Sequence, residues 1–288
     1  LDYTERLFDQ LAFLIPDGIS GGISTSPVSY KHWHTSDMAL DKAFTTGAES
    51  MAKIVLQLEQ IERNTGKYLH LDIEPEPDGM IENSDEVLYF YDTYLIPIAT
   101  QKLIAVLGCN KEKARDLILR HITVCYDVCH FSLAYEEPEY TLAKFKSAGI
   151  KVGKIQVSSA LKILFEEGDN EAIWHSLSQF NEPTYLHQVT EKIGNKVVTY
   201  RDLPEVLEQR SHAKELRSHF HVPIFLERYD HLFSTQDQIL KVLEYLRKDQ
   251  FSDQLEIETY TWDVLPQGLK TELSNCIVRE IEWLKSKI

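Results

Sequence analysis

Short apolar segments alternate with long helical patterns along this chain, and no other feature constrains its fold as strongly. The apolar segments are centred near residues 23, 71, 124, 155 and 257. Strands that are separated by helices of ten residues or more form βαβ units and pair in parallel. We therefore expect an α/β fold built on a parallel sheet.

The helices are predicted from apolar residues at helical spacing and from capping residues at their ends. They cover residues 4–15, 40–65, 83–107, 111–119, 140–149, 235–248 and 267–286. Asn83 or Ser84 is expected to cap the third helix, and Gly149 to end the fifth. Between about 160 and 218 the alternation is lost, and we expect an excursion with short helices and a hairpin that turns at Gly194.

Ionisable or polar residues stand at or just past the C-terminal ends of the predicted strands. They are Glu74, Glu76, Asp127, His130, Gln156 and Glu258. In a (β/α)8 barrel all strand ends meet around one pocket, whereas in an open doubly wound sheet only the strands at the switch point share a site. The chain has no GxGxxG or GxxxxGK[ST] phosphate loop. The sequence therefore favours a (β/α)8 TIM barrel.

The composition of the chain bears on which partners it could bind and in which compartment it is expected. The 288 residues include 45 Asp and Glu against 30 Lys and Arg, which gives a formal net charge of −15. Because nucleic-acid binding depends on clustered basic residues, which this chain lacks, nucleic acid is not favoured as a partner. No apolar run is long enough for a membrane span, and LDYTERLFDQ does not resemble a signal peptide. We expect a single cytoplasmic domain over residues 1–288.

The four cysteines, Cys109, Cys125, Cys129 and Cys276, show no CxxC spacing and are expected to be reduced thiols. Cys125 and Cys129 flank Asp127 and resemble a metal-binding pair. However, if Asp127 faces the interior of a barrel, strand alternation places Cys125 one layer deeper on the same face. A role in the core is therefore favoured for this pair.

Several longer strings give the sequence a family resemblance. They are ISTSPVSYK, DVCHFSLAYEEP, KIQVSSAL, YLHQV, FHVPIF and ETYTWDVLP, and they extend over nearly the whole chain. They resemble the EboE-like metabolite traffic proteins of the xylose isomerase-like TIM-barrel superfamily, which includes sugar-phosphate isomerases and epimerases and AP endonuclease family 2. In that order the predicted strands would be strands four to eight. The resemblance implies that strands one to three are supplied either by a further N-terminal segment or by a second copy or fragment that completes the barrel.

The resemblance also implies a metal site at the strand ends. Residue by residue, Glu74, Asp127 and Glu258 match the carboxylate ligands of the superfamily, and His130 matches a histidine that contacts the metal or the substrate. Independently of the resemblance, a set that mixes carboxylate oxygen with imidazole nitrogen suits Zn, Mn or Fe, whereas an oxygen-only set favours Mg or Ca. A divalent metal is therefore the expected cofactor, with Mg the less favoured ion.

Two histidines and one glutamine complete the comparison with the superfamily. His219 and His221 fall where the endonuclease branch has an Asp-x-His ligand pair, and their alternation places them on one face of a strand. The strand-seven ligand is normally a histidine, but Gln156 occupies that position, and an amide oxygen is a weak ligand for a transition metal. Either the number of metal ions is lower or His187 in YLHQV replaces the missing ligand.

Structural alternatives remain open for several of these residues. Asp127 could cap the segment that follows it, and His219 and His221 could be a structural pair. His70 and His121 stand at strand starts and are expected to be structural. The candidate substrate contacts are Gln156, His187, His32, His34 and Trp262.

The function expected from this site is isomerase or epimerase chemistry on a sugar, a sugar phosphate or a similar small polar metabolite. Glu74 and Glu258 would exchange the proton next to a carbonyl group that the metal polarises. One alternative is a metabolite-binding or traffic protein that does not turn its ligand over. A second is metal-dependent phosphodiester cleavage, which the acidic balance of the chain disfavours.

Overall fold

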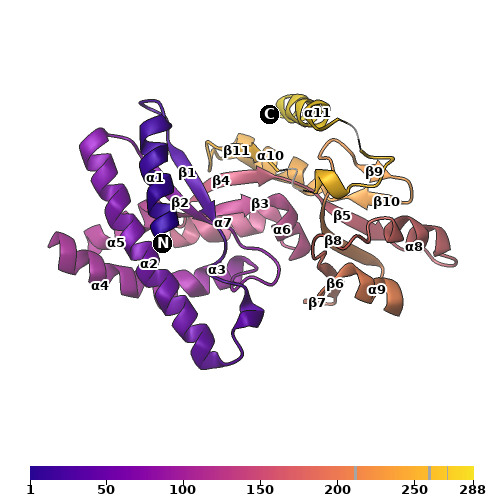
Figure 1. Ribbon diagram of the computed structural model, residues 1–288, viewed down its shortest axis with the longest axis horizontal. Helices are drawn as coiled ribbons and strands as arrows, with labels where there is room; N and C mark the ends of the chain where they lie inside the picture. The colour runs from indigo at the N-terminus through magenta and orange to yellow at the C-terminus, as the bar shows by residue number, and fades with distance from the viewer. Residues whose placement is uncertain (211–212, 259–260, 271) are drawn as a thin grey trace. The chain divides into compact units, whose positions relative to one another are not determined.

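The computed structural model describes residues 1–210, 213–258, 261–270 and 272–288 (Figure 1). The chain divides into two compact units. Unit 1 consists of Leu1–Tyr126, Leu142–Lys154 and Phe251–Gln254. Unit 2 consists of Asp127–Thr141, Ile155–Gln250 and Leu255–Ile288. Within the described residues, no helix has both the length and the apolar character that crossing a membrane requires.

The five predicted strands are present and form a sheet in the order β1-β2-β3-β4-β11. Their bounds are β1 Gly21–Thr25, β2 Leu69–Ile73, β3 Ile122–Asp127, β4 Val152–Val157 and β11 Leu255–Ile257. The pairs β1–β2, β2–β3 and β4–β11 are parallel, as the alternation with helices predicted.

The prediction of a (β/α)8 TIM barrel is nevertheless wrong. The described residues form this parallel sheet of five strands together with an antiparallel sheet of six, and not a complete eight-stranded barrel. Alternating strands and helices specify parallel pairing between neighbouring strands. Barrel closure depends in addition on the strand number, tilt and shear of the whole sheet, and no local pattern encodes these quantities.

Long helices accompany the strands of unit 1, and Figure 1 shows α1 and α2 beside β1 and β2. The helices of this part of the chain are α1 Asp2–Leu14, α2 Asp37–Thr65, α3 Ser84–Phe90, α4 Ile96–Leu107, α5 Lys111–His121 and α7 Pro138–Ala148. Asn83 caps α3 by accepting a hydrogen bond from the backbone N–H of Glu86, as predicted. The predicted helix over 83–107 contains a π-helical turn at Tyr91–Leu95. That turn directly precedes the N-terminal turn of α4, where Pro97 has no N–H to donate.

One face of β2 carries a buried polar pair. His70 Nδ1 lies 2.7 Å from Asp72 Oδ1, and Thr123 on β3 donates a hydrogen bond to the same oxygen. Two glycines make room for this carboxylate, because a Cβ atom would come within 2.2 Å of Asp72 Oδ2 at Gly22 and within 2.0 Å of Asp72 Oδ1 at Gly153. His70 therefore has the structural role that the sequence predicted.

The expected excursion is a second sheet with strand order β7-β6-β8-β5-β10-β9. Its strands are β5 Ala160–Leu164, β6 Val189–Ile193, β7 Lys196–Tyr200, β8 Glu215–His221, β9 Arg228–Tyr229 and β10 Leu232–Ser234. The predicted hairpin is confirmed, since β6 and β7 pair antiparallel around Gly194, whose φ is 61°. The accompanying helices are α6 Val128–Leu133, α8 Glu171–Ser178, α9 Leu203–Gln209, α10 Gln236–Lys248 and α11 Leu273–Lys285.

The second sheet has an apolar core of its own. Trp174 and Leu177 from α8 pack there with Leu216 and Phe220 from β8 and with Phe180. The rings of Phe180 and Phe220 meet edge to face with their centroids 5.0 Å apart. Because Phe220 is directed into this core, strand alternation turns its neighbours His219 and His221 toward the other face of β8.

Candidate metal centre

Asp127 ends β3 and is the N-cap of α6. Its Oδ1 atom accepts hydrogen bonds from the backbone N–H of His130 at 3.0 Å and from the hydroxyl of Ser158 at 2.7 Å. The hydroxyl oxygen of Ser158 also accepts a hydrogen bond from the backbone N–H of Cys129 at 3.0 Å. The capping interpretation of Asp127 is therefore confirmed, and the same bonds fix the start of the helix that carries Cys129 and His130.

His219 on β8 is held in a single tautomer by Gln188. Its Nδ1 atom lies 2.9 Å from Gln188 Oε1, and a carbonyl oxygen can only accept, so Nδ1–H is the donor. The lone pair of the neutral ring is then on Nε2, which lies 3.0 Å from Nε2 of His130. Burial first, and then the charges of His130 and His221, hold the pKa of His219 well below its ordinary value. His219 thus presents a neutral imidazole nitrogen, the form in which histidine binds metal.

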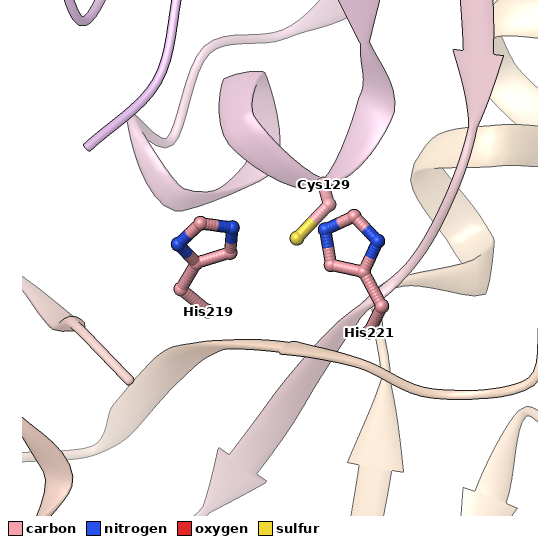
Figure 2. A group of neighbouring side chains, drawn as sticks. All are labelled: Cys129, His219 and His221. Atoms are coloured by element: carbon pink, nitrogen blue, oxygen red, sulfur yellow. The ribbon is translucent and has the colours of Figure 1, made fainter. Parts of the chain in front are cut away.

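Two groups of side chains in unit 2 could hold a metal ion, and both include His221. One consists of Asp127, His130 and His221, and the other of Cys129, His219 and His221. Within each group the ligand atoms lie within 4.8 Å of one another, and every member is buried. Figure 2 shows the sulfur of Cys129 directed into the space between the two imidazole rings of β8. Small side-chain rotations would bring such atoms to metal–ligand bonds of about 2.0–2.3 Å.

The protonation states of this cluster follow from its burial and its charges. Burial acts to raise the pKa of Asp127, but the neighbouring charges of His130 and His221 and a hydrogen bond with Glu258 hold it well below its ordinary value. Burial lowers the pKa of His221 to about 4. Burial also raises the pKa of the Cys129 thiol well above its ordinary value, and the nearby carboxylates act in the same direction. The buried thiol is therefore a poor nucleophile without a cation beside it.

Glu258 directly follows β11, as the sequence predicted, and lies beside this cluster. Its Oε2 atom is 3.9 Å from Nδ1 of His221, and its side chain is 23 % exposed. His221 and Glu258 also line a small cavity of about 10 Å³ together with Trp262 and Glu280. This volume is about what one water molecule needs.

His187 and Gln156 are buried in unit 2 but belong to neither group. Nδ1 of His187 lies 3.0 Å from the carbonyl oxygen of His219, and its Nε2 lies 2.7 Å from Glu182 Oε1. Because His187 belongs to neither candidate group, the hypothesis that it replaces a missing ligand is not supported. His187 instead holds the backbone that carries His219. Gln156 is 6 % exposed and lies in β4, where it pairs with Glu256.

Two further predicted residues belong to unit 1. Glu74 follows β2, and its backbone N–H donates to the carbonyl of Thr25 at 3.0 Å. His32 lies in a short 3-10 helix at Lys31–Trp33, with its Nε2 atom 2.8 Å from Asp78 Oδ1. Their predicted roles in catalysis and in substrate binding stay predictions.

Cys129 is the residue that sequence reasoning assigned only to the core. It does pack in the interior, in a buried cluster with Leu133 and Ala160, and it is a free cysteine as expected. Its sulfur also faces His219 and His221. The one local signal was its position two residues after Asp127, at the start of a helix. The local sequence around Cys129 gives no indication of its contact with β8, which lies about ninety residues later in the chain.

Comparisons of the chain with protein-family models, with curated proteins and with solved structures find no match. The assignment of a function therefore depends on the side-chain chemistry of the cluster itself. That chemistry is a buried combination of imidazole, carboxylate and thiol groups that could hold a metal ion.

Proposed function

We propose that this protein binds a divalent transition metal in unit 2 and uses it in isomerase or epimerase chemistry on a small polar metabolite. The observation that carries the proposal is the convergence of Asp127, Cys129, His130 and His219 on His221 in a site where each is at most 8 % exposed. Buried ionisable groups are costly unless they are paired or bind metal. A cluster of this kind is therefore a candidate for a functional site.

The donor atoms select the class of ion. Asp127, His130 and His221 offer one oxygen and two nitrogens, whereas Cys129, His219 and His221 offer one sulfur and two nitrogens. Neither set suits Mg or Ca, which prefer oxygen ligands only. We propose Zn, Mn or Fe for the first set, and the thiol of the second favours Zn.

In the proposed reaction a bound ion would act as a Lewis acid on the carbonyl oxygen of the metabolite. Asp127, whose pKa is low, remains ionised to hold the ion at neutral pH. Glu258 is the least buried carboxylate of the cluster and is proposed to move the proton of the substrate. Glu74 stays the proposed partner of Glu258 in proton exchange, on the basis of the resemblance alone.

Metal analysis of the purified protein by inductively coupled plasma mass spectrometry tests the first half of the proposal. We expect near-stoichiometric Zn, Mn or Fe in the wild type and a clear loss in Asp127→Asn, because the asparagine still caps α6 but offers no charged ligand. Asp169→Asn is the matched control, since Asp169 is exposed and accepts a hydrogen bond from the backbone N–H of Glu171 at 2.9 Å. A wild-type protein that neither contains nor takes up such an ion contradicts the proposal.

Turnover tests the second half. The metal-loaded protein is expected to interconvert an aldose and a ketose, or two epimers, and Glu258→Gln is expected to lower the rate by about a hundredfold or more, which is typical for the loss of a general base. Glu256→Gln changes an exposed carboxylate on the same strand and serves as the control. Unchanged turnover in Glu258→Gln would exclude the proposed role of Glu258.

A non-catalytic metabolite-binding or traffic function is the second candidate. The observation in its favour is the burial of the candidate metal ligands, with a cavity of about 10 Å³ beside His221 and Glu258. A closed site of this kind is typical of structural ions. The resemblance of the sequence to EboE-like metabolite traffic proteins supports the same candidate. Stoichiometric metal with no turnover of any sugar or sugar phosphate would favour this function over the first.

A further inference from the structure

A cavity of about 500 Å³ lies within unit 1, and none of the residues that line it belongs to the metal cluster. It is lined by α2, by the C-terminal end of β1 and by the segment that follows β1. Its volume falls in the range of about 300–1,000 Å³ that is typical of sites for small organic ligands. The cavity therefore has room for a small organic ligand.

The charge of the lining contrasts with the charge of the chain. The sequence contains 45 Asp and Glu residues, yet none of them lines this cavity, whereas Lys42 and His34 do. Hydroxyl groups line the same cavity, namely those of Thr4, Thr25, Ser26, Ser29 and Ser50 and that of Thr46, which donates to the carbonyl oxygen of Lys42 at 2.8 Å. Among the described residues, no carboxylate lies within salt-bridge distance of the Lys42 ammonium group. Positive charge and hydroxyl donors without competing carboxylates are what an anionic group requires.

The wall of the cavity contains a strained backbone turn. Val28 has a φ of 73°, a conformation that is unfavourable for a β-branched residue. The turn is closed by two short hydrogen bonds, from Val28 N–H to the carbonyl of Ser26 at 2.8 Å and from Ser29 N–H to the carbonyl of Pro27 at 2.9 Å. Strained residues of this kind concentrate at ligand sites and persist only where the surrounding structure holds them.

Several contacts hold this turn in place. The methyl groups of Val28 pack against Gly47 of α2, where an added Cβ would come within 2.9 Å of Val28 Cγ1. Nε2 of His34 and Oγ of Ser29 lie 3.0 Å apart, and the backbone N–H of Met80 donates to the carbonyl of Ser29 at 2.9 Å. A glycine in a helix interior lowers helix stability by about 1 kcal/mol relative to alanine. Gly47 thus destabilises α2 but allows Val28 to pack closely against it.

We propose that this cavity binds a small organic anion. Its phosphate or carboxylate group contacts Lys42 and the surrounding hydroxyls, and its uncharged body lies against the apolar floor that Met51, Ile54 and Leu71 provide. This site is separate from the proposed metal function, because all of its residues belong to unit 1 and none is a metal ligand.

Isothermal titration calorimetry on the full chain tests the proposal with two probes, inorganic phosphate and citrate. We expect saturable binding of at least one probe, and the stronger of the two identifies the preferred anionic group. Lys42→Met should weaken that binding about tenfold or more, as expected for the loss of a charged hydrogen-bond donor. Lys53→Met is the matched control, because Lys53 is also an exposed lysine of α2 but does not line the cavity.

A second variant keeps the test decisive if the lysine is merely one of several contacts. Ala43→Leu adds bulk inside the cavity and should abolish binding of the probe while the metal content stays at the wild-type value. If neither probe binds the wild type, or if Lys42→Met binds as tightly as Lys53→Met, the proposal is overturned. A wild-type protein that binds a probe but contains no metal would contradict the metal proposal alone.

Discussion

The candidate metal cluster of unit 2 and the cavity of unit 1 both contain polar side chains, but they differ in how closely these side chains lie together and in the space beside them. In the cluster, five buried side chains that could be metal ligands lie close together, and a cavity of about 10 Å³ lies beside His221. In the cavity, hydroxyls and two basic residues surround about 500 Å³ of space. The first arrangement fits an ion, and the second fits an organic molecule.

The comparison teaches that the candidate metal ligands and the larger cavity are found in different units of this chain. The cluster offers ligands for a metal ion, whereas the cavity offers room for an organic molecule and is lined by no carboxylate. Each region can therefore be disrupted while the other is left intact. Variants that do so test whether the two proposals are independent.

The largest expected effect comes from His221→Ala. Because His221 belongs to both ligand groups, its loss leaves only two members in each, and we expect the affinity for Zn to fall by more than about a hundredfold. His175→Ala removes an exposed histidine of the same unit and should leave metal binding unchanged. Equilibrium dialysis against Zn at a fixed pH measures both. Wild-type affinity in His221→Ala would show that neither group is the metal site.

The residues of the candidate metal site illustrate what could and could not be predicted from the sequence. Asp127, His130 and Glu258 were found because each stands where a predicted strand ends, and strand ends are a local signal. The hairpin around Gly194 was also predicted from a local signal, its turn residues. The pairing of β8 with β5 and β6 was not predicted, since it joins residues far apart in the sequence and depends on long-range packing.

The same limit explains the two main differences. The fold prediction extended local parallel pairing to a closed barrel, and closure is a property of a whole sheet. The interpretation of Cys129 considered only the alternation along one strand. Its contact with His219 and His221 arises because α6 begins directly after Asp127 and turns the following residues toward β8. Neither fact is visible in a pattern of one segment.

The second prediction concerns pH and the helix α11. Burial raises the pKa of Glu280 from 4.5 to about 7, while its Oε1 accepts a hydrogen bond from the backbone N–H of Ile224 at 3.0 Å. Since the folded protein keeps this proton to a higher pH than the unfolded chain does, the stability that depends on it is complete below about pH 4.5 and is lost as the pH rises to about 7. The free energy of unfolding should fall over that window by an amount on the order of 3 kcal/mol.

Glu280→Gln is expected to remove this dependence, because the amide oxygen can still accept the bond from Ile224 and carries no charge. Urea denaturation of the metal-free protein at pH 4.5 and pH 8 measures the effect. The variant should match the wild type at the lower pH and exceed its stability at the higher pH. Glu282→Gln, which alters an exposed carboxylate of the same helix, should follow the wild type at both values. A Glu280→Gln variant that is no more stable at pH 8 would contradict the assignment.

The smallest expected effect concerns the buried carboxylate of Asp72 in unit 1, which belongs to none of the candidate metal groups found among the described residues. A Cβ atom at Gly153 would come within 2.0 Å of Asp72 Oδ1, so Gly153→Ala must displace that carboxylate or the strand. We expect a loss of about 1–3 kcal/mol in the free energy of unfolding, which is typical of overpacking. The same Cβ atom would also come within 2.4 Å of Thr123 Oγ1 and 2.5 Å of His70 Nδ1, so the cost should shrink in part when Gly153→Ala is made in an Asp72→Ala background. Thermal or urea unfolding of the four proteins of this cycle gives the coupling energy. A coupling energy near zero would mean that Gly153 is needed by the strand itself and not by the Asp72 carboxylate. The carboxylate of unit 1 would then not depend on close packing, and it would no longer contrast with the candidate metal-binding carboxylate of unit 2.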